Sequence, residues 1–159
     1  MTLSIRSLHS SPRQRHASFG LTLYRTKPSE KDEKDWFSNA LKKGTDGNLI
    51  MLVALVQSLM VGWCDVESVA PNTPADHRGS LGVCVRKEFR KRGIGKELVK
   101  AALEKCKGRF ESLELEVFAN NRAAIRLYQG FGFEVYGRRE RSIKRGTRYF
   151  EEELMRRNF

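Results

Sequence analysis

The stretch best suited to chemistry is a short basic turn that contains two glycines. Arg90-Lys-Arg-Gly93-Ile-Gly95-Lys96 follows a strand-like segment and opens a helix-like one. Glycines let backbone amides approach a ligand closely, and the first amides of a helix lack intrahelical acceptors and carry partial positive charge. The basic side chains add full charges. The pattern favours a phosphate or pyrophosphate site; the alternative is an ordinary glycine-containing turn with solvated basic residues.

Spacing excludes two familiar phosphate-binding motifs. A Walker loop requires a glycine and a hydroxyl where this chain has Arg90 and Glu97. A dinucleotide fingerprint requires a third glycine where Leu98 stands.

A second segment brings two carboxylates, an asparagine and a tyrosine into one stretch. Glu114 and Glu116 alternate with apolar residues, so both lie on one face of a predicted strand. Two neighbouring carboxylates favour protonation of one of them, which suits a general base near neutrality. Asn120 or Asn121 is placed to cap a short helix that ends at Gly130. Solvated strand residues and a simple helix cap are the alternatives.

The two segments together resemble the GNAT N-acetyltransferases. Arg90-x-x-Gly93-x-Gly95 after a strand is similar to that family's acetyl-CoA motif, Arg/Gln-x-x-Gly-x-Gly/Ala. Leu115–Phe133 is similar to its strand–Asn–helix–Tyr–Gly-Phe segment, and Tyr128 stands seven residues after Asn121. The resemblance is to bacterial-type amino-acid and ribosomal-protein N-terminal acetyltransferases. It runs from Leu49 to the C-terminus and covers the preceding residues only by element order.

The resemblance implies the site residues and their roles. The pyrophosphate of acetyl-CoA would lie on the amides that open the helix, and the pantetheine would pair with the preceding strand, where the Val85 amide would donate to the thioester oxygen. Tyr128 would be the general acid, and Glu116 the general base. A core tyrosine is the alternative for Tyr128, and no metal is expected. The cofactor-binding set is Val83, Cys84, Val85, Arg90, Lys91, Arg92, Gly93, Ile94, Gly95, Lys96 and Asn121.

Hydrophobic periodicity predicts alternating strands and helices, which indicates an α/β fold. With the resemblance, we expect one GNAT domain over residues 1–159, with a central mixed sheet of about six to seven strands and about four helices. A helix is expected from Ser29 to Gly44 and another from Gly93 to Cys106. The predicted strands are Thr2–Leu8, Leu49–Val56, Leu59–Val66, Ser80–Arg86, Ser112–Ala119, Phe133–Lys144 and Thr147–Met155.

Composition limits the function classes. The 159 residues carry 30 Lys and Arg against 19 Asp and Glu, a net charge of +11 that favours an anionic partner. No apolar run is long enough for a membrane span, and three cysteines in no metal spacing indicate reduced interior thiols of a cytoplasmic protein. The acid-free first 29 residues resemble an organellar transit peptide, but a first strand and polar loop is the interpretation we favour.

We therefore expect an acetyl-CoA-dependent N-acetyltransferase. A free L-amino acid or a peptide N-terminus fits as acceptor, its carboxylate held by an arginine such as Arg138 or Arg148. A polyamine fits less well because the chain is itself cationic. The alternative is a basic module that binds RNA or the ribosome through the arginine-rich segment 138–148. No membrane partner is expected, and a homodimer is left open.

Overall fold

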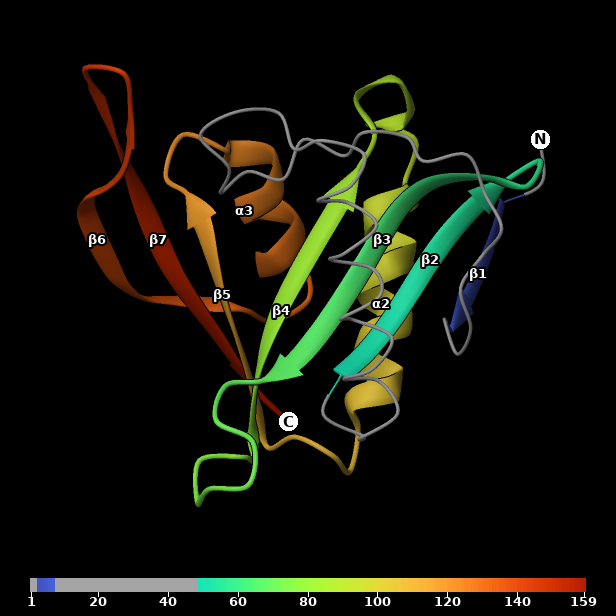
Figure 1. Cartoon of the computed structure of the whole chain (residues 1–159), viewed down its shortest axis with the longest axis horizontal. Helices are drawn as coiled ribbons and strands as arrows, with labels where there is room; N and C mark the ends of the chain where they lie inside the picture. The colour runs from blue at the N-terminus through green and yellow to red at the C-terminus, as the bar shows by residue number, and fades with distance from the viewer. Residues whose placement is uncertain (1–2, 8–48) are drawn as a thin grey trace. The chain divides into compact units, whose positions relative to one another are not determined.

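The computed structural model describes residues 3–7 and 49–159. The described residues belong to two compact units, and strand β4, labelled in Figure 1, contributes residues to both. Unit 1 comprises residues up to 68 together with 82–106, and unit 2 comprises 69–81 and 107–159. The hydrogen-bonded strand order is β1-β2-β3-β4-β5-β7-β6, so the seven strands form one mixed sheet.

Unit 1 is built on antiparallel strands with one long helix. β1 (Leu3–Ser7), β2 (Leu49–Val56) and β3 (Leu59–Ser68) pair antiparallel in chain order. Gln57 and Ser58 turn between β2 and β3 with φ of 48° and 64°, the left-handed geometry that matches the twist of a two-residue hairpin. The end of β4 (Arg78–Val85) leads through a 3₁₀ turn, η1 (Lys87–Phe89), into α2 (Ile94–Cys106).

The core of unit 1 lies between α2 and strands β2 and β3. The buried face of α2 repeats at helical spacing and consists of Ile94, Leu98, Val99, Ala102, Leu103 and Cys106. Gly62 on β3 permits a close approach, because a Cβ there would lie 2.9 Å from the Cys84 carbonyl oxygen and 3.2 Å from Leu98 Cδ1. This packing fixes where α2 begins relative to the end of β4.

Unit 2 contains the remaining strands and a short helix. β5 (Ser112–Phe118) pairs in parallel with the start of β4 and antiparallel with β7 (Arg148–Asn158). β6 (Glu134–Arg145) forms a hairpin with β7, and its register shifts twice, between Val135 and Gly137 and between Arg139 and Ile143. The helix α3 (Arg122–Gln129) connects β5 to β6.

The structure confirms the α/β class and the predicted order of strands. β2 has the predicted bounds, whereas β3 and β7 run on to Ser68 and Asn158, beyond the predicted ends. The described residues contain two α-helices, fewer than the expected four. The predicted helix from Ser29 to Gly44 lies outside the described residues. Within residues 3–7 and 49–159, no helix combines the length and the apolar character that a membrane crossing requires.

Candidate functional site

The predicted phosphate-binding turn joins β4 to α2. The Arg86 amide donates to the Val61 carbonyl at 2.9 Å, and Arg90 Nε donates to the Val85 carbonyl at 2.9 Å, which fastens both ends of the η1 turn. Lys91 and Gly93 have φ of 60° and 79°, and this left-handed backbone turns the chain into the helix. The first α-helical bond runs from the Glu97 amide to the Gly93 carbonyl at 3.1 Å.

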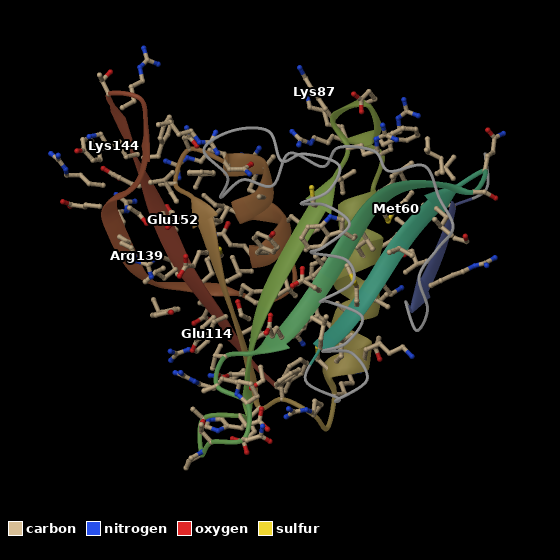
Figure 2. All side chains as sticks on the ribbon, in the orientation of Figure 1. Met60, Lys87, Glu114, Arg139, Lys144 and Glu152 are labelled. Carbon is tan, nitrogen blue, oxygen red and sulfur yellow. The ribbon has the colours of Figure 1, made fainter. Side chains whose placement is uncertain are left out.

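Six consecutive amides, Lys91 to Lys96, precede that first helical bond. Among residues 3–7 and 49–159, no backbone carbonyl accepts from them. Unsatisfied amides and the helix dipole together attract an anion. A side chain built at Gly93 would meet nothing within 4 Å, so its surroundings are open. Lys91, Arg92 and Lys96 are exposed, and Figure 2 shows Lys87 on the same connection. The turn therefore has the donors and charge that a pyrophosphate requires.

Val83, Cys84 and Val85, the predicted pantetheine strand, form the half-buried end of β4. Burial raises the pKa of the Cys84 thiol, and Arg90 opposes that shift only in part. The thiol is therefore protonated near neutral pH and is a poor nucleophile. This agrees with the predicted reduced interior thiol, and the cofactor role predicted for Cys84 depends on its backbone.

Asn121 and Tyr128 lie at opposite ends of α3. The Asn121 side chain accepts a hydrogen bond from the Ala124 amide at 3.2 Å, so Asn121 rather than Asn120 is the N-cap. Tyr128 is buried and packs edge-on against Phe133, with ring centroids 5.9 Å apart. The Phe133 amide donates to the Tyr128 carbonyl at 3.1 Å. Burial and the edge-on contact with Phe133 therefore restrict the Tyr128 ring.

Glu114 and Glu116 share a face of β5 as predicted, but an arginine neighbours each of them. Glu114 Oε1 accepts from Arg156 Nε at 3.1 Å and lies 3.5 Å from Arg78 Nη1. Both oxygens of Glu116 accept from Arg139, at 2.9 and 3.0 Å. Glu114 thus contacts two guanidinium groups and Glu116 contacts one, so arginines compensate both carboxylates.

Two charged residues near Glu116 were not placed in the site by sequence reasoning. Glu152 on β7 is buried, and Arg139 Nη1 lies 3.5 Å from its Oε2. The Ser142 hydroxyl donates a hydrogen bond to the same oxygen. An acidic residue in each of two predicted strands is a weak signal for such a contact, because Glu152 lies opposite Phe118 and the hairpin register that brings in Arg139 is interrupted by a bulge.

The basic hairpin is partly neutralised within the chain. Arg138 lies 3.4 Å from Glu153 Oε1 and 3.8 Å from Glu151 Oε2. Arg141 stacks over the Tyr149 ring with its guanidinium carbon 3.9 Å from the centroid. Part of the charge that favoured a nucleic-acid surface is therefore used inside the hairpin.

These features define a class: mixed α/β proteins with a basic, glycine-containing turn between a strand and a helix, and a buried tyrosine on a capped helix. The model of the acetyltransferase (GNAT) family matches residues 7–133. The chain therefore belongs to the acetyltransferase (GNAT) family.

The chain is similar in sequence to two curated acetyltransferases. It is 30% identical over 102 residues to the L-amino acid N-acetyltransferase AaaT of Escherichia coli, covering 63% of this chain and 62% of that protein. It is 39% identical over 59 residues to a probable spermine N(1)-acetyltransferase of Bacillus subtilis subsp. natto, covering 33% of this chain and 36% of that one. The chain thus matches less than two thirds of either relative.

The fold also matches a phosphinothricin acetyltransferase from Sinorhizobium meliloti, whose structure was solved in complex with acetyl-CoA. The TM-score is 0.80 at 21% identity, covering 100% of this chain and 89% of that one. This match establishes the GNAT fold.

Proposed function

We propose that the protein transfers the acetyl group of acetyl-CoA directly to a primary amine. The observation that carries the proposal is the row of amides from Lys91 to Lys96 at the start of α2, which lack backbone acceptors among the described residues. Exposed basic side chains flank them. This combination suits the pyrophosphate of a coenzyme A derivative. Family membership and the acetyl-CoA complex of the Sinorhizobium meliloti relative support it.

The strand end before the turn provides the second part of the proposed cofactor site. Val83, Cys84 and Val85 would pair through their backbone with the pantetheine arm. The Val85 amide would donate to the thioester oxygen, where negative charge grows as the amine attacks. Asn121 caps α3 with its side-chain oxygen, and its amide group would hydrogen-bond the pantetheine.

The proposed chemistry requires three proton movements. The acceptor ammonium first gives one proton to a base, and the neutral nitrogen then forms a bond to the acetyl carbon while the carbon–sulfur bond breaks. Tyr128 gives its phenolic proton to the departing thiolate, and the second proton that leaves the nitrogen restores the Tyr128 phenol. The edge-on packing of the buried Tyr128 ring against Phe133 supports the acid role, because it restricts where the phenol can lie.

We propose Glu116 as the base that takes the amine proton. Its side chain is 49% exposed and accessible to an acceptor, but both oxygens are bonded to Arg139. Each oxygen keeps a second lone pair beside the one that accepts from Arg139, so Glu116 can take a proton there or after Arg139 releases one oxygen. A water chain or Glu114 is the alternative, and Glu114 is less accessible at 18% exposure.

The acceptor we favour is a free L-amino acid or a peptide N-terminus. The E. coli relative is named for L-amino acids, whereas the match to the probable spermine enzyme covers only 36% of that protein. The net charge of +11 slows the encounter with a polycation. Among the hairpin arginines, Arg138 is already paired with acids while Arg148 is exposed, so Arg148 is the better holder for an acceptor carboxylate.

A panel assay of CoA release tests this proposal. Wild-type protein with acetyl-CoA is offered free L-amino acids, peptides with free N-termini and spermine at equal concentration. We expect at least one amino acid or peptide to exceed spermine in kcat/KM. Preference for spermine would overturn the acceptor class, and the absence of CoA release with every amine would overturn the proposed reaction.

A further inference from the structure

Three strands of unit 2 contribute to one charge network around Glu116. Arg139 on β6 bonds both oxygens of Glu116 on β5, at 2.9 and 3.0 Å. Arg139 Nη1, which donates to Glu116 Oε2, also lies 3.5 Å from Glu152 Oε2 on β7. The Ser142 hydroxyl donates to the same Glu152 oxygen. Figure 2 shows Arg139 and Glu152 on their neighbouring strands. One guanidinium thus serves two carboxylates that are far apart in the sequence.

The two carboxylates differ in exposure, which gives them different roles. The Glu152 side chain is 7% exposed, whereas those of Glu116 and Arg139 are each 49% exposed. A buried carboxylate requires compensating donors, so Glu152 retains a hold on Arg139 and Ser142. The exposed Glu116 is the member that can meet an acceptor.

The charges of the network add to −1, since two carboxylates share one guanidinium. The hydrogen bond from Arg139 to Glu116 raises the pKa of Arg139 above its usual value, so the guanidinium stays charged. Glu152 therefore competes with Glu116 for a permanent cation. A stronger ion pair between Glu152 and Arg139 weakens the effect of the Arg139 charge on Glu116.

We infer that Arg139 is a positioning residue that sets the orientation and the proton affinity of Glu116. Glu152 opposes this effect because it binds the same guanidinium. The inference rests on the proposed function, in which Glu116 is the base. As an acceptor ammonium approaches, Arg139 releases one Glu116 oxygen and moves its freed N–H toward Glu152. The proton passes from the amine nitrogen to the released oxygen, and no other bond is made or broken.

The remaining groups that face Glu116 do not replace this control. On β5 its neighbours on the same face are Phe118 and Glu114, and Glu114 is engaged by Arg156 and Arg78. On β7 the residue opposite Glu116 is the apolar Leu154, with Glu152 and Arg156 to either side. From β6, Tyr136 acts on Arg139 and stacks beneath Arg156. Within residues 3–7 and 49–159, Arg139 is thus the cation that contacts Glu116 directly.

The inference predicts shifts of opposite sign in the pH–rate profile. Arg139→Gln removes the cation, so Glu116 is protonated more easily and the acid limb of kcat/KM moves up by about one pH unit. Glu152→Gln removes the competing anion, so the acid limb moves down by up to about one pH unit. In a Glu116→Gln background neither change should move the limb. A merely structural role would not give opposite signs.

The control is Arg109→Gln, which breaks another arginine–carboxylate pair of unit 2, with Asp76 at 2.9 Å. It removes the same charge and should leave the acid limb in place. Folding of each variant is checked by circular dichroism and thermal melting. Shifts of the same sign, no shift, or shifts that persist without Glu116 would overturn the inference.

A second readout separates this inference from the proposed reaction. The carboxyl carbon of Glu116 is titrated by ¹³C NMR in the wild type and both variants, with no substrate present. We expect its midpoint to rise in Arg139→Gln and to fall in Glu152→Gln. Unchanged midpoints would overturn the network even if acetylation is observed. Shifted midpoints without CoA release from any amine would overturn the proposed reaction and confirm the control of Glu116 by Arg139.

Discussion

Replacing Gly62 by alanine places a methyl group where β3, the end of β4 and α2 approach one another closely. The new Cβ would lie 2.9 Å from the Cys84 carbonyl oxygen, 3.2 Å from Leu98 Cδ1 and 3.3 Å from Val85 Cγ2. The nearest atom belongs to the backbone of a strand, so relief requires the strand or the helix to move. Overpacking of this kind costs about 1–3 kcal/mol of unfolding free energy.

For a chain of this length, each kcal/mol corresponds to about 2–4 °C in Tm. We therefore expect Gly62→Ala to lower Tm by about 4–8 °C, taking the middle of the range at about 2 kcal/mol. Acetyl-CoA affinity should fall as well, because Cys84 and Val85 belong to the strand proposed to pair with the pantetheine.

The matched control is Gly137→Ala on β6. There a Cβ would lie 3.4 Å from Leu154 Cδ1, an ordinary contact with a flexible side chain. Both variants are measured by urea unfolding and by isothermal titration with acetyl-CoA. If Gly62→Ala is as stable as Gly137→Ala, the close approach of β3, β4 and α2 is not the constraint described.

Two further variants test the role of Tyr128 as general acid and the burial of the Cys106 thiol. Tyr128→Phe keeps the ring packed against Phe133 at 5.9 Å, so stability and acetyl-CoA affinity should be retained while kcat falls by about 10²-fold; full turnover on an acceptor for which chemistry is rate-limiting would refute the acid role. Burial raises the pKa of Cys106 from 9.0 to about 12, so between these values the unfolded thiol has lost its proton and the folded thiol has kept it. Stability from this thiol is therefore complete below pH 9.0 and declines up to pH 12, and the urea-measured advantage of wild type over Cys106→Ala should shrink in that window. A constant advantage would contradict the burial of this thiol.

Local sequence patterns predicted the elements that depend on local interactions. β2 is a continuous apolar run that ends at the Gln57-Ser58 turn, so both bounds could be predicted. The start of α2 follows from its glycines and apolar period. β7 extends three residues beyond the predicted end at Met155, to Asn158. Its last residues are polar and show no alternation, and they join the strand by pairing with the start of β5.

In the candidate site too, the parts set by local sequence could be predicted and the contacts between distant strands could not. The residues of the α2 turn are contiguous, so their motif could be recognised in the sequence, and Asn121 as N-cap follows from one local hydrogen bond. The partner of Glu116 could not be predicted. Arg139 reaches it across β7, and the bulge between Arg139 and Ile143 changes which hairpin residues face one another. The burial of Glu152 could not be predicted either, because the arginine that compensates its charge comes from a different strand.

The central claim is that the amides opening α2 bind the pyrophosphate of acetyl-CoA, and calorimetric titration of Gly93→Trp tests it most directly. Gly93 has φ of 79° with nothing within 4 Å of a built Cβ, and Gly108, two residues after α2, has φ of 77° in equally open space. Gly108→Trp therefore matches the backbone strain and the added bulk. We predict saturable acetyl-CoA binding, weakened by salt, in wild type and Gly108→Trp, and no binding in folded Gly93→Trp. Unchanged acetyl-CoA affinity in folded Gly93→Trp would contradict the claim.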